Sequence, residues 1–157
     1  MGQAWQVASS NGVPGPCATQ LPYSLVTRNV VEDPQLQRVA GDRDVAIVAS
    51  YALTGGVLTG KYATDQAAGR AAGQLDQPRY AAGAAAGREL AALAADLGRD
   101  PAQLAMAFVL LNPAVTTLLF GATRPEQVHA NAGALAVAAT LTAAERARLS
   151  AVGLPGG

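Results

Sequence analysis

The segment Gly55–Lys61 carries the residue types of a phosphate-binding loop. It fits the pattern G-x-x-x-x-G-K, in which backbone N–H groups and a lysine surround phosphate oxygens. The next residue, however, is Tyr62, where such a loop needs a small hydroxyl residue for Mg²⁺. Ala63–Pro78 then mixes Gly and Ala without an apolar period, which predicts a long functional loop rather than a phosphate-holding helix. Nucleoside triphosphate binding is therefore weakly supported.

A second group of polar residues follows the apolar run Val115–Phe120. Thr123–Glu126 has the spacing of a capping box, which predicts a helix from Thr123 to about Leu135. Arg124 lies at that predicted N-terminus, where unpaired N–H groups and a partial positive charge favour an anion. Gln127 and Asn131 lie one turn further on, on the same helix face. The alternative is an ordinary helix cap with a solvated arginine.

These segments are set among alternating strand and helix patterns. Cys17–Leu21 is a short extended run stopped by Pro22. Val45–Ala49 and Val115–Phe120 are predicted to be strands buried on both faces of a parallel sheet. Helices are predicted over Ala4–Ser10, Pro34–Ala40, Tyr80–Leu97, from Asp100 to Leu111, and from Thr142 onward. Asp33 and Asp100 are predicted N-caps, each followed by a proline, and Thr142–Glu145 has the spacing of a second capping box. Three strands separated by helices predict a parallel α/β fold.

Composition limits the classes of function. The chain has 157 residues, enough for one domain, with 11 basic and 11 acidic residues in no basic stripe, so we expect no nucleic acid partner. Met1–Gln3 begins no signal segment and no run reaches a membrane span. The single cysteine, Cys17, excludes an internal disulfide, and we expect a cytoplasmic protein. We expect structural roles for Cys17, at the start of a buried strand, and for Trp5 and His129.

Four segments resemble the aldo/keto reductase family in order and spacing. They match its "Q-x-x-Y-S-L", "YSPLxxGxLTGKY", "SPAQLALAWVL" and "IGASxPEQxxxN" segments, and the last form is closest to the branch with potassium-channel β subunits and related bacterial reductases. The segments are Gln20–Leu25, Ser50–Tyr62, Asp100–Leu111 and Leu119–Gln127 with Asn131.

The resemblance implies the C-terminal half of a (β/α)₈ TIM barrel, with about three parallel strands and flanking helices over residues 1–152 and a flexible tail at 153–157. Three strands cannot close a barrel. We therefore expect an exposed apolar face that self-associates or binds a complementary half-barrel chain.

The resemblance also implies an NADP(H) site without a metal. Gln20 would hydrogen-bond the nicotinamide carboxamide, while Lys61 and Arg70 would bind phosphates. Arg124 would grip the 2′-phosphate that separates NADP from NAD, and Gln127 and Asn131 would contact the adenosine end. The implied cofactor-binding set is Gln20, Ser50, Tyr51, Leu53, Gly55, Lys61, Arg70, Gly121, Thr123, Arg124, Gln127 and Asn131.

The sequence departs from the family at two positions. Ser50 stands where an aromatic ring usually stacks on the nicotinamide, and Tyr51 follows one place later. A shift by one residue in a strand reverses side-chain facing, so Tyr51 could serve only if the strand ends before it. Ala130 stands where related proteins often have an adenine-contacting Glu.

The family's catalytic Asp, Tyr, Lys and His belong to earlier strands, and nothing in this chain matches them. The only lysine and histidine are Lys61 and His129. We therefore expect an aldehyde- or ketone-reducing fold that is inactive alone, with no catalytic residue here. The alternatives are a non-catalytic module that binds NADP or a protein, and a decayed or split gene product.

Overall fold

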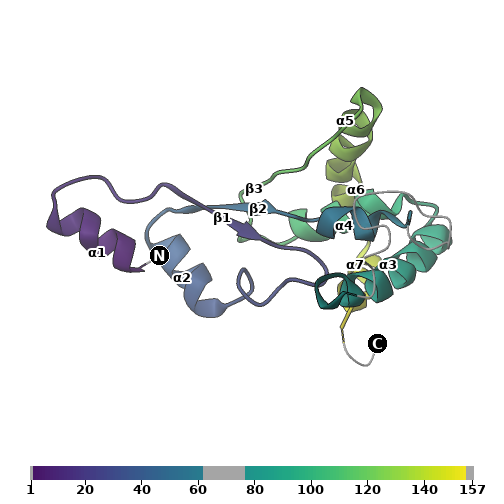
Figure 1. The fold of residues 1–157 in the computed structure, drawn as a ribbon, viewed down its shortest axis with the longest axis horizontal. Helices are drawn as coiled ribbons and strands as arrows, with labels where there is room; N and C mark the ends of the chain where they lie inside the picture. The colour runs from purple at the N-terminus through teal and green to yellow at the C-terminus, as the bar shows by residue number, and fades with distance from the viewer. Residues whose placement is uncertain (1, 62–76, 155–157) are drawn as a thin grey trace.

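A three-stranded parallel sheet forms the centre of the protein. In a computed structural model that describes residues 2–61 and 77–154, the strand order is β1-β2-β3 (Figure 1). The strands are β1 (Ala18–Pro22), β2 (Ala46–Ser50) and β3 (Thr117–Leu118). Ala18 pairs with Ala46, and Val48 pairs with Thr117. The predicted α/β class and the parallel strands are confirmed.

Three of the six predicted helix starts are confirmed by their caps. Asp33 accepts a hydrogen bond from the Gln35 N–H, Asp100 accepts one from the Gln103 N–H, and Thr142 forms a full capping box with Glu145. The α-helices are α1 (Gly2–Ser10), α2 (Pro34–Asp42), α3 (Pro78–Leu97), α4 (Pro101–Leu110), α5 (Pro125–Ala132), α6 (Ala134–Thr140) and α7 (Ala143–Ala151). A short 3₁₀ segment, η1 (Thr54–Thr59), follows β2 and was not predicted.

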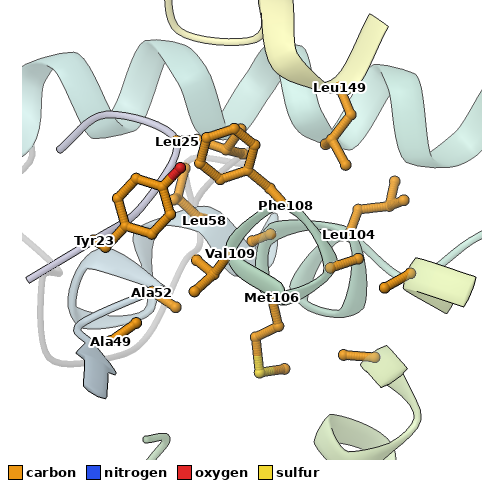
Figure 2. Packing of buried hydrophobic residues seen from close by; sticks show 14 of the residues in the cluster. Tyr23, Leu25, Ala49, Ala52, Leu58, Leu104, Met106, Phe108, Val109 and Leu149 are labelled. Carbon is orange, nitrogen blue, oxygen red and sulfur yellow. The ribbon is translucent and has the colours of Figure 1, made fainter. Parts of the chain in front are cut away.

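Helix α4 lies at the centre of the hydrophobic core. Six consecutive residues, Leu104–Val109, are buried, and side chains of η1, α7 and the sheet point toward them (Figure 2). The Tyr23 ring packs against Phe108 with centroids 5.4 Å apart. A helix buried all round needs neighbours on every side, and here β3, α3, α5, α6, α7 and η1 supply them.

The two faces of the sheet differ. Ile47 and Ala49 of β2 are buried in the core, whereas Ala46 and Val48 on the opposite face remain half-exposed. Burial of β2 on both faces was therefore a wrong prediction, because the described helices pack on one face only. We call the other side the open face, and in β1 and β2 it comprises Ala18, Gln20, Pro22, Ala46, Val48 and Ser50.

Three local predictions near β3 and β1 are also wrong. Only Thr117–Leu118 pairs as a strand, and Leu119 and Phe120 are 47% and 39% exposed, since β3 is an edge strand among the described residues. The single helix expected from Thr123 is divided at Gly133 into α5 and α6. Cys17 is exposed just before β1, in contrast to the buried position expected.

The remaining predictions concern segment ends and the membrane. Gly153, the first residue of the expected tail, donates its N–H to the Glu89 carboxylate at 2.9 Å. Residues 155–157, most of the expected loop Ala63–Pro78, and Arg70 lie outside the described residues. Among the described helices, none combines the length and the hydropathy that a bilayer crossing needs.

Candidate cofactor site

The loop after β2 contains an unusual run of left-handed backbone. Tyr51 and Thr54 have φ values of 62° and 49°, and Gly55 and Gly56 have 67° and 91°. Glycine adopts this region readily, whereas a residue with a Cβ incurs about 1–2 kcal/mol. Strained positions of this kind cluster at functional sites. The run therefore marks the carboxyl end of β2 as a candidate site.

Hydrogen bonds hold this strained loop against the sheet. The Thr54 hydroxyl donates to the Ser24 hydroxyl at 3.3 Å, and both residues are buried. Ser24 follows β1, so the contact joins the chain segments that leave two neighbouring strands. Neither Thr54 nor Ser24 was predicted as a site residue. A left-handed backbone at a threonine cannot be recognised from the sequence, and the adjacent Gly55–Gly56 is the one local sign of it.

Tyr23 anchors the same end of the sheet. Its buried hydroxyl donates to Glu32 Oε1 at 2.8 Å and accepts from Asn112 Nδ2 at 2.9 Å. Burial, above all, raises the pKa of Tyr23 to about 12; the Asn112 hydrogen bond opposes this effect and Glu32 adds to it. The phenol therefore stays protonated, and its role is to hold the carboxyl end of β1 in place.

Three predicted site residues, Tyr51, Leu53 and Lys61, lie close to the neighbouring glycines Gly55 and Gly56. A Cβ on Gly55 would lie 3.4 Å from the Tyr51 hydroxyl, and a Cβ on Gly56 would lie 3.1 Å from Lys61 Nζ. Tyr51 is 49% exposed, and Lys61 is exposed as well. This cluster combines a phenol, an ammonium and backbone without side chains, which suits contact with a planar or anionic ligand. Half-buried Leu53 is the N-cap residue just before η1.

The structure resolves the Ser50 and Tyr51 question in favour of Tyr51 as the accessible side chain. Strand β2 ends at Ser50, and the Ser50 hydroxyl donates to the Leu21 carbonyl of β1 at 3.2 Å. Because Tyr51 lies beyond the strand with a positive φ, strand alternation does not dictate its facing. Gln20 is exposed on the open face, two residues before the end of β1.

Helix α5 carries the second group of candidates. Arg124 is exposed and occupies the N-cap position of α5, with no side-chain cap hydrogen bond, so the predicted Thr123–Glu126 capping box is wrong. The Gln127 carboxamide oxygen instead accepts from the Thr123 N–H at 2.8 Å and the Thr123 hydroxyl at 3.2 Å. The Gln127 side chain thus takes the Thr123 N–H to which the Glu126 side chain was expected to bond.

The start of α5 borders an open depression. It is lined by Ala122, Thr123, Arg124, Pro125, Val128 and His129. Gly121 precedes it, exposed, and Asn131 is half-buried one turn after Gln127. A guanidinium above a helix N-terminus suits a phosphate group, since both present N–H donors and positive charge. His129 is exposed on the helix surface, as expected.

The structure thus divides the predicted residues into three places. Tyr51, Leu53, Gly55 and Lys61 lie together after β2, Gln20 lies on β1, and Thr123, Arg124, Gln127 and Asn131 lie along α5. Gln20 lies near the carboxyl end of its strand and the others follow strands, toward the edge at which α/β proteins place their ligands. Helix α5 stands away from the sheet (Figure 1).

The fold is that of an α/β protein with part of a TIM barrel, and its candidate ligand-binding residues lie toward the carboxyl edge of the strands. The sequence profile of the aldo/keto reductase family matches residues 2–153. The chain belongs to the aldo/keto reductase family.

Curated relatives agree with this assignment. The chain is 32% identical over 142 residues to a protein of Schizosaccharomyces pombe provisionally named a voltage-gated potassium channel subunit beta, covering 84% of this chain and 40% of that protein. A rice protein with a similar provisional name is 31% identical over 147 residues, with 89% and 44% covered. Protein tas of Escherichia coli is 34% identical over 130 residues, with 80% and 37% covered. The chain spans about two fifths of the length of these relatives.

Proposed function

We propose that this chain is the cofactor-binding part of an NADP(H)-dependent reductase of aldehydes or ketones. The observation that carries the proposal is the exposed Arg124 at the N-terminus of α5, which follows the strand β3. The chain belongs to a family of oxidoreductases. A guanidinium fork at the start of α5 matches a 2′-phosphate, which NADP has and NAD lacks.

The remaining candidates divide the rest of the cofactor between them. NADPH supplies a hydride when it is bound. In this proposal Lys61 and Gly55 lie against its pyrophosphate, while Gln20 and Tyr51 orient its nicotinamide end. The exposure of the Tyr51 ring and its position beyond β2 support a stacking contact.

We propose that the chain alone reduces carbonyl compounds slowly at best. Hydride delivery to a carbonyl needs a proton donor, and positioned general acids contribute about 10²- to 10⁴-fold in rate. Tyr23 cannot serve as this donor, because its hydroxyl is buried against Glu32 and its pKa is raised to about 12.

An NADPH titration of the purified chain, followed by nicotinamide fluorescence, tests the proposal. We expect saturable binding that prefers NADPH to NADH. Arg124→Ala should weaken NADPH binding by about ten- to hundredfold, since hydrogen bonds to charged groups contribute about 1.5–3 kcal/mol, and NADH binding much less.

The matched control is Arg38→Ala, which removes an exposed arginine from α2 and should leave both affinities unchanged. If the Arg124→Ala protein bound NADPH and NADH with the same affinities as the wild type, the proposal would be contradicted. Binding of ATP that is abolished by Lys61→Ala would instead support a phosphate-binding loop at Gly55–Lys61.

The open face favours a second proposal: association with a polypeptide that supplies further barrel strands. Parallel sheets are usually covered on both faces, yet no described helix covers Val48 here. Leu119, whose N–H extends the ladder to Ala49, is 47% exposed beside it. The part of the open face formed by β1 and β2 carries no charged residue. Charged residues are likewise depleted at the centres of protein interfaces.

Sedimentation equilibrium tests this second proposal. The chain is measured alone and with the part of the E. coli relative that it does not match. We expect a one-to-one complex with that part, weakened by Leu119→Lys. If the chain associated with itself and formed no complex with that part, the partner of the open face would be a second copy of the chain.

A further inference from the structure

One side chain from the core reaches the protruding helix α5. Gln103 lies in the first turn of α4, next to the buried run Leu104–Val109. Its Nε2 donates to the Ala130 carbonyl in the last turn of α5 at 2.7 Å. This hydrogen bond joins the most buried helix of the fold to a helix with no buried residue.

Helix α5 lies beside α4 and α6, but it has few other polar side-chain contacts that fix its direction. It has eight residues, and isolated helices of that length are marginal in water. Within residues 2–61 and 77–154, the remaining side-chain hydrogen bonds of α5 are those of Gln127 with Thr123, which lie inside the helix and its entry loop. The Gln103 amide is thus the polar side-chain contact from the rest of the described fold.

Two local features adapt the site to this contact. A Cβ at Gly133 would lie 2.7 Å from Gln103 Nε2, so a larger residue there would force the end of the Gln103 side chain to shift away from its present place. In a capping box, the Gln side chain would bond back to the N-cap N–H. Here Asp100 accepts the Gln103 backbone N–H at 3.0 Å, while the Gln103 carboxamide donates to Ala130.

We propose that Gln103 is a positioning residue for the cofactor site: through Ala130 it sets the orientation of α5, and with it the places of Arg124, Gln127 and Asn131. The link to cofactor affinity rests on the proposed NADP(H) function. The link to the order of α5 does not, because it concerns the protein alone.

Hydrogen exchange of the purified chain tests the first link. Gln103→Leu keeps the side-chain size and removes the donor. A net hydrogen bond of about 0.5–1.5 kcal/mol predicts a three- to tenfold loss of protection in α5, with protection in α4 and α7 and the thermal midpoint unchanged. The control is Gln35→Leu, the same change at an exposed α2 position. Unchanged protection of α5 in Gln103→Leu would overturn the proposal.

An NADPH titration of the same variants tests the second link. We expect Gln103→Leu to raise the Kd by three- to tenfold, and Gln103→Lys, which restores an N–H donor, to recover most of the affinity. Gly133→Ala should mimic Gln103→Leu and add little to it, because both changes remove the same contact.

Lost protection of α5 with unchanged affinity would overturn the positioning role. Absence of NADPH binding to the wild-type chain would refute the proposed function, whereas the exchange experiment would still decide the role of Gln103 in ordering α5.

Discussion

The loop after β2 and helix α5 both follow parallel strands at the carboxyl edge of the sheet, yet they are held in opposite ways. The loop keeps a strained backbone, and Thr54, Val57 and Leu58 within it are 3%, 1% and 0% exposed. Helix α5 has ordinary dihedral angles and no buried residue. The strained backbone of the loop thus persists because buried side chains hold it in place. Helix α5 lacks such contacts, and we expect it to open with a lower free energy, as ligand-binding elements often do.

The largest expected contrast comes from truncating one apolar side chain in each region. Leu58→Ala should lower the free energy of unfolding by about 2–5 kcal/mol, because it leaves a cavity in a fully buried position. Val128→Ala, at a position in α5 that is 46% exposed, should change it by at most about 0.5 kcal/mol. Urea unfolding measures both. Similar losses in the two variants would show that α5 is also part of the core.

Alkaline unfolding probes the hydrogen bonds that hold the end of β1. The pKa of Tyr23 is raised from 10.0 to about 12, so the stability that this group contributes is present below pH 10 and declines as the pH rises toward 12. The two-unit difference corresponds to about 2–3 kcal/mol. Tyr23→Phe should be less stable than wild type at pH 8, and this deficit should shrink or reverse near pH 12. A deficit independent of pH would contradict the raised pKa.

A pair of glycine substitutions tests the strain in the loop itself. Gly56→Ala should destabilise the fold by about 1–2 kcal/mol, because φ at this position is 91° and a Cβ would meet Lys61 Nζ at 3.1 Å. Gly41→Ala, in α2 with nothing within 4 Å of its Cβ, should instead stabilise by about 0.4–1 kcal/mol. Thermal unfolding distinguishes the signs. Stabilisation by both changes would show that the loop relaxes.

The smallest contrast concerns the two predicted capping boxes. Thr142→Ala should lower the free energy of unfolding by about 1 kcal/mol, because Thr142 and Glu145 form the full box at the start of α7. Thr123→Ala should alter hydrogen exchange in α5 alone, since its hydroxyl contacts only Gln127 among the described residues. Chemical denaturation and exchange separate the two effects. An equal global loss in both variants would contradict the division between core and α5.

The accuracy of the sequence predictions follows the range of the interactions involved. Caps at Asp33, Asp100 and Thr142 depend on residues within three positions, and all three are confirmed. At Thr123 the same local pattern was wrong, because Gln127 competes for its N–H. The carboxyl-edge location of Tyr51, Gly55 and Lys61 was predictable from motif order, whereas the left-handed Thr54 and its contact with Ser24, 30 residues away, were not.

The sequence by itself determined the alternation of strands and helices, most of their ends, and the family, because apolar period, caps and motif spacing are local properties of the chain. The tertiary structure alone decided which sheet face is covered, that Leu119 and Phe120 are exposed, and that α5 depends on Gln103 and Gly133. Each of these depends on which segments, distant along the chain, lie within contact of one another, and burial and hydrogen bonding act only across such contacts.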